Sequence, residues 1–178
     1  MSGSSKKGSS SPQGVLPKPV PVLKKTGSKK ARLRAARLAS VQLLYRMDVM
    51  NELEQLSPEL IARAIADFRH SDYGQDDESP PLISPDMEWV ERLLCRCELE
   101  KVHAVLHSIM KEDSSLQRLE PLLRAVLRVA IADMLWMQSE APVIPDYLHI
   151  TSAFYQDKEA GLINAILDQA QQYIANKE

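Results

Sequence analysis

The sequence is short of the residues that β-rich folds need. It contains six glycines, of which four lie before residue 28, so only Gly74 and Gly161 serve the rest of the chain. Folds built from hairpins and tight turns use more glycine than that, and aromatic residues are also scarce, at 5%. Leu, Ala, Ile, Glu, Gln and Arg, which favour helices, are frequent instead. Because 178 residues suffice for one domain, we expect a single all-α domain.

Cysteines and long apolar runs are scarce as well. The chain has two cysteines, Cys95 and Cys97, which excludes a disulfide framework and supplies half the ligands of a four-ligand zinc site. It has no apolar run of about 18 residues, the length that a membrane helix needs. The basic N-terminus lacks the apolar core of a secretory signal. We therefore expect a cytoplasmic protein with reduced cysteines, no membrane span, no bound metal and no cofactor.

Acidic residues are absent from the first 47 positions. That segment holds 11 of the 22 Lys and Arg residues, whereas residues 48–178 hold all 24 Asp and Glu residues. Such asymmetry indicates a segment with an electrostatic role of its own. Lys and Arg neutralise phosphates and release counterions, so a nucleic acid is the main expectation, with a solubilising tail or contact with an acidic protein as alternatives. The tail has no aromatic residue for base stacking, so base recognition would come from the folded part.

The chain divides into a tail and a helical domain. Residues 1–28 are rich in Ser, Gly, Pro and Lys and predict a disordered basic tail, followed by a domain at 29–178. Ser28 is a candidate N-cap for the first helix, in which apolar residues recur at helical spacing at Leu38, Val41, Leu44 and Tyr45. Further helices are predicted at 58–70, 84–110, 121–137, 145–155 and 159–174.

Histidine pairs are the candidate catalytic or metal sites. His103 and His107 lie four residues apart on one helical face, but zinc hydrolases with this spacing carry Glu directly after the first His, where this chain has Ala104. Asp146 and His149 are three residues apart and could pair, although such a pair is more often a helix-surface contact than a catalytic dyad. The sequence also lacks a Gly-rich phosphate loop and a G-x-S-x-G motif. We expect a protein that is not an enzyme.

Three stretches of the chain resemble the NusB family. Residues 35–48, AARLASVQLLYRMD, are similar to the family's opening pattern A-R-x-x-A-x-Q-x-L-Y. Residues 122–130, LLRAVLRVA, resemble its central helix, and residues 154–168 resemble its closing pattern, in which a Phe is followed by [VI]-N-x-[VI]-L-D. The three occur in the family's order, so the resemblance covers roughly residues 30–172.

The resemblance implies a fold and a function. The fold would be a helical bundle of two packed three-helix subdomains. Family members are bacterial factors of transcription antitermination that bind the boxA segment of single-stranded RNA together with the ribosomal protein that acts as NusE. That complex joins RNA polymerase and supports processive rRNA transcription, and some members form homodimers. Two alternatives stay open: an RNA-binding module like the N-terminal domain of some rRNA methyltransferases, and a diverged paralogue that binds only protein.

The predicted site lies at the start of the first helix. By resemblance, Arg34 and Arg37 fall on the family's arginine-rich RNA-binding start, and Tyr45 falls where a family tyrosine lies near the partner protein. For Tyr45, packing in the core is the alternative. The predicted RNA-binding residues are Lys24, Lys25, Lys29, Lys30, Arg32, Arg34 and Arg37.

The C-terminal part departs from the family pattern. Pro145 stands where the family has Asn in I-N-E, and because proline is tolerated only in a first turn, we expect that helix to start late. Gly161 and Gln169 stand where members often carry Lys. Because basic groups are missing here and abundant in the N-terminal tail, the RNA footprint is expected to differ from the usual one.

Overall fold

The computed structural model describes residues 26–70, 83–110, 116–137 and 143–177. These residues form α-helices and two short 3₁₀ turns, with no β-strand among them, as the composition predicts. The elements are α1 (Lys29–Val49), η1 (Leu53–Gln55), α2 (Pro58–His70), α3 (Met87–Arg96), α4 (Leu99–Ile109), η2 (Leu116–Arg118), α5 (Pro121–Trp136), α6 (Val143–Ser152) and α7 (Asp157–Ala175). The predicted tail before residue 26, with Lys24 and Lys25, lies outside the described residues.

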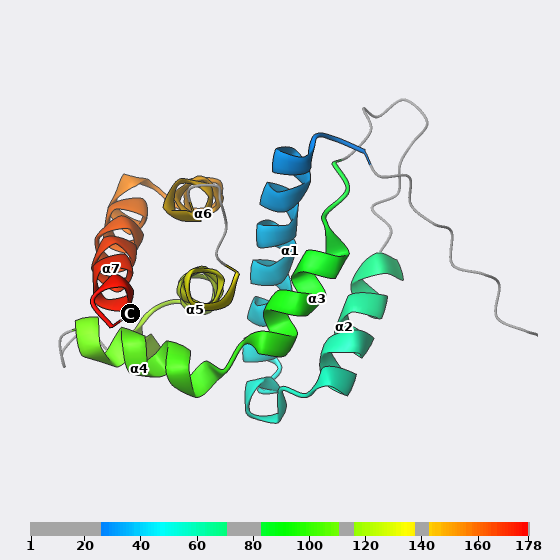
Figure 1. Cartoon of the computed structure of the whole chain (residues 1–178), viewed down its shortest axis with the longest axis horizontal. Helices are drawn as coiled ribbons and strands as arrows, with labels where there is room; N and C mark the ends of the chain where they lie inside the picture. The colour runs from blue at the N-terminus through cyan, green and yellow to red at the C-terminus, as the bar shows by residue number, and fades with distance from the viewer. Residues whose placement is uncertain (1–25, 71–82, 111–115, 138–142, 178) are drawn as a thin grey trace, which may run out of the picture.

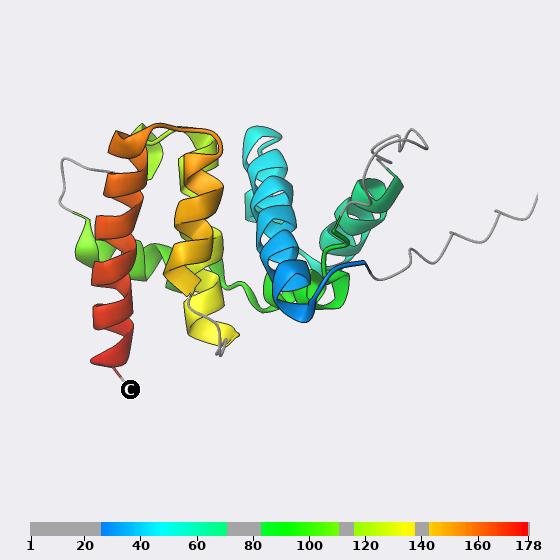
Figure 2. The same ribbon diagram turned by 90° about the horizontal axis from the view of Figure 1, so that it is seen from above.

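The helices form two groups side by side (Figures 1 and 2). One group holds α1, α2 and α3, and the other holds α4, α5, α6 and α7, with α4 running across α5 and α7 (Figures 1 and 2). The contact between the groups is made above all by α1 and α5. None of the helices in the described ranges is long and apolar enough to cross a membrane.

Capping residues begin the first helices where the sequence predicts. The Ser28 hydroxyl accepts a hydrogen bond from the backbone N–H of Ala31 at the start of α1. The Ser57 hydroxyl does the same for Leu60 at the start of α2. Each bond satisfies one of the N–H groups that have no partner inside the helix. The predicted boundaries of α2 are confirmed, and those of α7 differ from the prediction by two residues or fewer.

The predicted long helix over 84–110 is wrong, because the structure breaks it into α3 and α4. At Cys97 and Glu98 the backbone leaves the helical region, with ψ of 95° at both residues. The reason is tertiary: α3 packs against α1 and α2, whereas α4 packs against α5 and α7, so the chain must turn between the two groups. No glycine or proline lies at the break, and the apolar pattern continues through it.

The helix around Pro145 also differs from the prediction. It begins at Val143 rather than late, and it ends at Ser152 rather than at Tyr155. Pro145 is its third residue, still within the first turn, where the missing N–H has no partner inside the helix in any case.

Helix α5 is the central helix, as its nearly continuous apolar sequence predicts. Its buried residues run from Leu123 to Asp133 with few interruptions, and α1, α3, α4, α6 and α7 all contact it. Two charged residues, Arg128 and Asp133, are buried among them. Since a buried charge is tolerated only when it is paired, each of these two residues needs a partner, which lies on another helix.

Candidate nucleic-acid interface

The start of α1 carries exposed positive charge. Lys29 and Lys30 are exposed in its first turn, which contains no acidic residue. Arg34 follows one turn later with 46% of its side chain exposed. Cations at a helix N-terminus oppose the helix dipole, at a cost of typically 0.3–1 kcal/mol each. An anion bound at this end would remove that cost.

The predicted site residue Arg32 is more enclosed than these three. Its side chain is 16% exposed, and its Nη2 lies 3.7 Å from Oδ2 of Asp86, the residue that caps α3. The Nε of Arg32 is buried without a hydrogen-bond partner. Arg32 therefore links the starts of α1 and α3 while remaining partly accessible beside the exposed cations.

The chain that enters α1 is held against the segment before α3. Thr26 and Ser84 are bonded to each other through both backbone and side chain, with 3.0 Å between the two hydroxyl oxygens. Between Thr26 and α1, Gly27 has a φ of 93°, and a Cβ there would lie 3.0 Å from a methyl group of Ile83. Glycine is required here both by the left-handed backbone and by the close approach. The entry point of the basic segment is thereby fixed.

Arg37 occupies the interior rather than the surface. Its side chain is 0% exposed, and its Nε donates to Oδ2 of Asp133 at 2.8 Å while its Nη1 donates to Oδ2 of Asp146 at 2.5 Å. The rings of Trp89 and Tyr147 flank the guanidinium, with centroids 6.0 and 5.9 Å from its Cζ. A group buried in this way is not available to a phosphate in this structure, so the burial of Arg37 does not support its predicted contact with RNA.

The electrostatics of Arg37 follow from this environment. Burial by itself lowers the pKa of its guanidinium, but the negative charge of Asp133 and the hydrogen bonds that Arg37 donates to Asp133 and Asp146 outweigh it, so the net shift of the pKa is upward. Burial, followed by the charge of Asp133, raises the pKa of the Tyr147 hydroxyl, which donates to Asp133 at 3.2 Å. Arg37 therefore stays charged and the Tyr147 hydroxyl keeps its proton.

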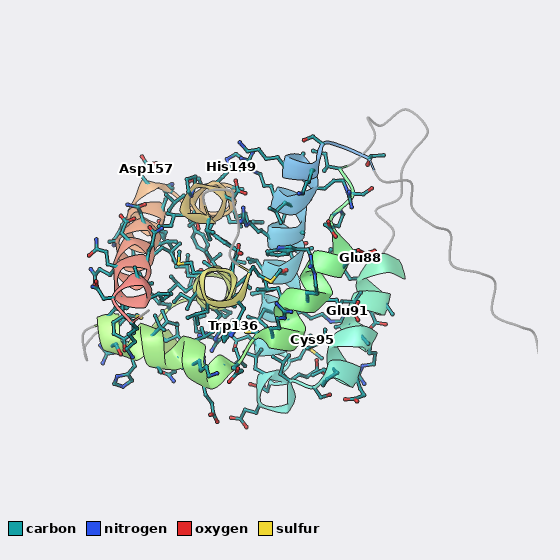
Figure 3. The ribbon with its side chains drawn as sticks, in the orientation of Figure 1. Glu88, Glu91, Cys95, Trp136, His149 and Asp157 are labelled. Atoms are coloured by element: carbon teal, nitrogen blue, oxygen red, sulfur yellow. The ribbon has the colours of Figure 1, made fainter. Side chains whose placement is uncertain are left out.

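Asp146 joins Arg34 to this buried cluster. Its Oδ1 accepts from Nε of Arg34 at 2.8 Å, while its Oδ2 is bonded to Arg37. The sequence-based idea that Asp146 pairs with His149 is wrong, because the carboxylate is directed to α1, while His149 is exposed on α6 (Figure 3). We name the set Arg34, Arg37, Asp133 and Asp146 the upper ion cluster.

A second ion cluster lies at the other end of the contact between α1 and α5. Oδ2 of Asp48, on α1, accepts from Nε of Arg124 at 2.9 Å and lies 3.1 Å from Nη1 of Arg128. Arg128 also donates through Nε to Nε2 of His103, at 3.1 Å. Burial, and then the charge of Arg128, lower the pKa of His103. His103 is thus engaged by an arginine, and no group of residues that could hold a metal ion occurs among the described residues.

Tyr45 lies at the surface beside the turn between α6 and α7. It is 40% exposed, which is too open for the core-packing alternative, and Phe154 in that turn is 55% exposed. Tyr155, in the same turn, interacts electrostatically with Tyr45, and burial and a hydrogen bond to Glu120 raise the pKa of Tyr155 to about 12. Tyr45 and Phe154 are therefore both exposed aromatic residues, and Tyr155, next to Phe154 in the sequence, lies within electrostatic range of Tyr45.

Sequence reasoning missed several of these residues. They are Asp48, Arg124, Arg128, Asp133 and Phe154. The available signal was the presence of isolated charged residues in the otherwise apolar helix α5, because buried charges need partners. The partners themselves, on α1, could not be identified from local spacing.

Comparison with known sequences identifies relatives. The family model described as the NusB family matches residues 34–172. The transcription antitermination protein NusB of Rhodospirillum rubrum is 32% identical over 165 residues, which cover 85% of this chain and 89% of that protein. The protein of the same name from Brucella anthropi is 29% identical over 156 residues, covering 85% of this chain and 87% of that one.

Solved structures have the same fold. A crystal structure of the antitermination factors NusB and NusE in complex with dsRNA matches with a TM-score of 0.61 at 19% identity, covering 82% of this chain and 99% of that one. A structure of T. maritima NusB matches with a TM-score of 0.59 at 18% identity, covering 81% and 93%. Since the family model spans most of the sequence and the fold agrees, this chain belongs to the NusB family.

Proposed function

We propose that this protein binds boxA-type single-stranded RNA together with the ribosomal protein that acts as NusE, and so takes part in transcription antitermination. The complex would join RNA polymerase and promote processive rRNA transcription. Family membership supports the proposal, as do relatives that are named transcription antitermination proteins. The observation that carries the RNA-binding part is the exposed basic start of α1, which has no acidic residue in its first turn.

The proposed phosphate contacts are made by Lys29, Lys30, Arg32 and Arg34. Lys29 and Lys30 are exposed and can reach a phosphate directly, and nearly half of the Arg34 side chain is exposed. The Arg fork can bind a phosphate with two parallel hydrogen bonds. Lys24 and Lys25 directly precede the anchored Thr26 and are retained in the proposal on their sequence position alone.

The proposed contact with the partner protein is made by Tyr45. Tyr45 and Phe154 are 40% and 55% exposed, and aromatic residues are enriched at the centres of protein interfaces. Val49 and Met50, at the end of α1, are more than half exposed and add apolar surface. The same surface is also suited to the interface of a homodimer, because a homodimer formed there would bury the same rings.

Two other functions are less well supported. The relatives that match over 85–89% of their length are named antitermination proteins, which favours that function over an RNA-binding module of an rRNA methyltransferase. A paralogue that binds only protein would not need the exposed cations at the start of α1. Measurement of RNA binding separates this alternative from the proposal.

The test is fluorescence anisotropy with a boxA-like RNA and a scrambled RNA, each with and without the partner ribosomal protein, over a range of salt concentrations. We compare wild type with a triple variant, Lys29→Gln, Lys30→Gln and Arg34→Gln. Each phosphate contact removed should lower the slope of log affinity against log salt by about 0.7 on a single strand.

A matched triple variant controls for net charge. Arg63→Gln, Arg96→Gln and Lys101→Gln remove three exposed charges from α2, the end of α3 and α4, all away from the start of α1 (Figure 1). This control should keep both the affinity and the slope. If both triple variants behave alike, the assignment of the phosphate contacts to the start of α1 is wrong. If wild type shows no RNA binding while it still captures the partner, the protein-only alternative holds.

A further inference from the structure

We infer that Asp146 is a positioning residue for RNA recognition, because it holds Arg34 in the orientation that presents its guanidinium to a phosphate. The inference rests on the proposed function and goes beyond it by assigning a role to a buried carboxylate on α6. The relationship is a bond between two helices: Oδ1 of Asp146 accepts from Nε of Arg34 at 2.8 Å.

Arg34 makes this bond with Nε, the guanidinium nitrogen next to its aliphatic chain. Among the contacts that the described residues make, Arg34 is bonded only through Nε, and nearly half of its side chain is exposed. The donors on its two terminal nitrogens remain for a ligand. A guanidinium anchored at Nε still has the fork that binds phosphate oxygens, and an anchored side chain loses less rotamer entropy when the ligand binds.

The anchor itself is rigid. The Asp146 side chain is 7% exposed, and its second oxygen is bonded to Arg37, which is in turn bonded to Asp133 and flanked by Trp89 and Tyr147. Arg34 is therefore connected through one carboxylate to a buried cluster that spans α1, α5 and α6. On this inference Arg37 contributes to RNA binding by holding Asp146 in place, and it does not contact the RNA itself.

Charge alone predicts the opposite effect for Asp146. The upper ion cluster holds two arginines and two aspartates, so it adds no net positive charge at the surface. A phosphate that reaches Arg34 also approaches the negative charge of Asp146, which by Coulomb's law disfavours binding. Removal of the carboxylate should therefore strengthen RNA binding if its charge is what matters, and weaken RNA binding if it orients Arg34.

The experiment is a double-mutant cycle on boxA-like RNA with the full chain. We expect Arg34→Ala to weaken binding about tenfold, which corresponds to the loss of a charge-assisted contact. Asp146→Ala should weaken binding by a similar factor despite the lost negative charge. The double variant Arg34→Ala plus Asp146→Ala should bind no more weakly than Arg34→Ala alone, because the two residues act as one unit.

Two further variants separate positioning from folding. Asp146→Glu keeps a carboxylate and should regain at least part of the affinity. The Arg34→Lys substitution is at a surface position; it keeps the positive charge but lacks the guanidinium fork. It should lower the affinity for RNA and leave the salt slope and the melting temperature unchanged. The folded state of every variant is checked by circular dichroism at the assay temperature.

The outcomes distinguish the inference from the proposed function. If Asp146→Ala binds as tightly as wild type or more tightly, or if the losses in the double variant add, the inference is overturned while the RNA site at Arg34 stands. If Arg34→Lys binds as tightly as wild type, the requirement for a positioned fork is overturned. If the boxA-like RNA does not bind wild type at all, the proposed function itself fails.

Discussion

Arg37 of α1 and Asp133 of α5 form an ion pair in which neither side chain has any exposed surface, with 2.8 Å between Nε and Oδ2. A buried pair of this kind costs desolvation free energy and is retained only when its hydrogen bonds are nearly all made. Here Asp146 and the Tyr147 hydroxyl provide the further bonds. The pair links the two helix groups at their most extensive contact.

Replacement of Arg37 should strongly destabilise the fold. In Arg37→Met the carboxylates of Asp133 and Asp146 lose their shared partner, and removal of one member of a buried pair costs about 3–5 kcal/mol. Urea unfolding monitored by circular dichroism measures this loss. The control is Arg63→Met, which removes an exposed ion pair with Glu52 and should cost less than about 1 kcal/mol. Equal losses in the two variants would contradict the buried role of Arg37.

Acidification should destabilise the fold through His103. Burial, and then the charge of Arg128, lower the pKa of His103 in the folded protein, with a smaller opposing effect from Asp48. The unfolded chain therefore takes up a proton on this residue at a higher pH than the folded chain does. The stability that neutral His103 provides is thus complete above the usual histidine pKa of about 6.5 and is lost as the pH falls below it.

The measurement is the free energy of unfolding of wild type and His103→Gln between about pH 7.5 and pH 5.5, the range around the histidine pKa. The amide oxygen of Gln can still accept from Arg128 but does not titrate. We expect wild type to lose more stability over this range than the variant. Parallel curves would show that His103 does not carry the effect.

The two exposed aromatic residues should matter for binding and little for stability. Tyr45→Ala plus Phe154→Ala removes rings from residues that are 40% and 55% exposed, so the free energy of unfolding should change by about 1 kcal/mol or less per site. Capture of the partner ribosomal protein should fall about tenfold or more if these rings are central to the interface. Leu162→Ala, an exposed apolar change on α7, is the matched control, and an equal loss of capture there would count against the assignment.

The two cysteines should differ in reactivity. Burial raises the pKa of the Cys97 thiol to about 11, although Arg128 opposes the shift, and the side chain is buried. Cys95 is exposed two residues away, on α3 beside Glu91 (Figure 3). Because the thiolate is the nucleophile, iodoacetamide at mildly alkaline pH should modify Cys95 in the native protein and Cys97 only after unfolding. Mass spectrometry of peptides shows which cysteine is modified. Fast modification of Cys97 in the native protein would contradict its burial.

Local signals predicted the helices well. Ser28 and Ser57 cap α1 and α2, and the apolar sequence of α5 gave both its bounds and its central position. The break between α3 and α4 could not be predicted, because it is caused by the passage of the chain between two helix groups rather than by Gly or Pro.

The site was predicted less well than the fold. The resemblance to the family assigns Arg37, with Arg34, to the RNA-binding start of the first helix, but the structure buries its side chain. Its partners are Asp133 and Asp146, which are 96 and 109 residues away in the sequence. No periodicity within α1 carries that information. Arg34 differs from Arg37 only in lying one turn nearer to the helix start, where the neighbouring helices no longer cover it.

The exposure of Arg34 and Tyr45 on one helix has a geometric consequence. They are 11 residues apart, which in an α-helix is close to three full turns, so they face nearly the same direction and lie about 16 Å apart along the axis. Ion clusters at both ends of the contact with α5 fix the rotation of α1 about that axis. An RNA at Arg34 and a protein at Tyr45 would therefore be neighbours on one side of the molecule, close enough to touch each other. Each would then increase the affinity for the other without any change in the shape of the helix between them.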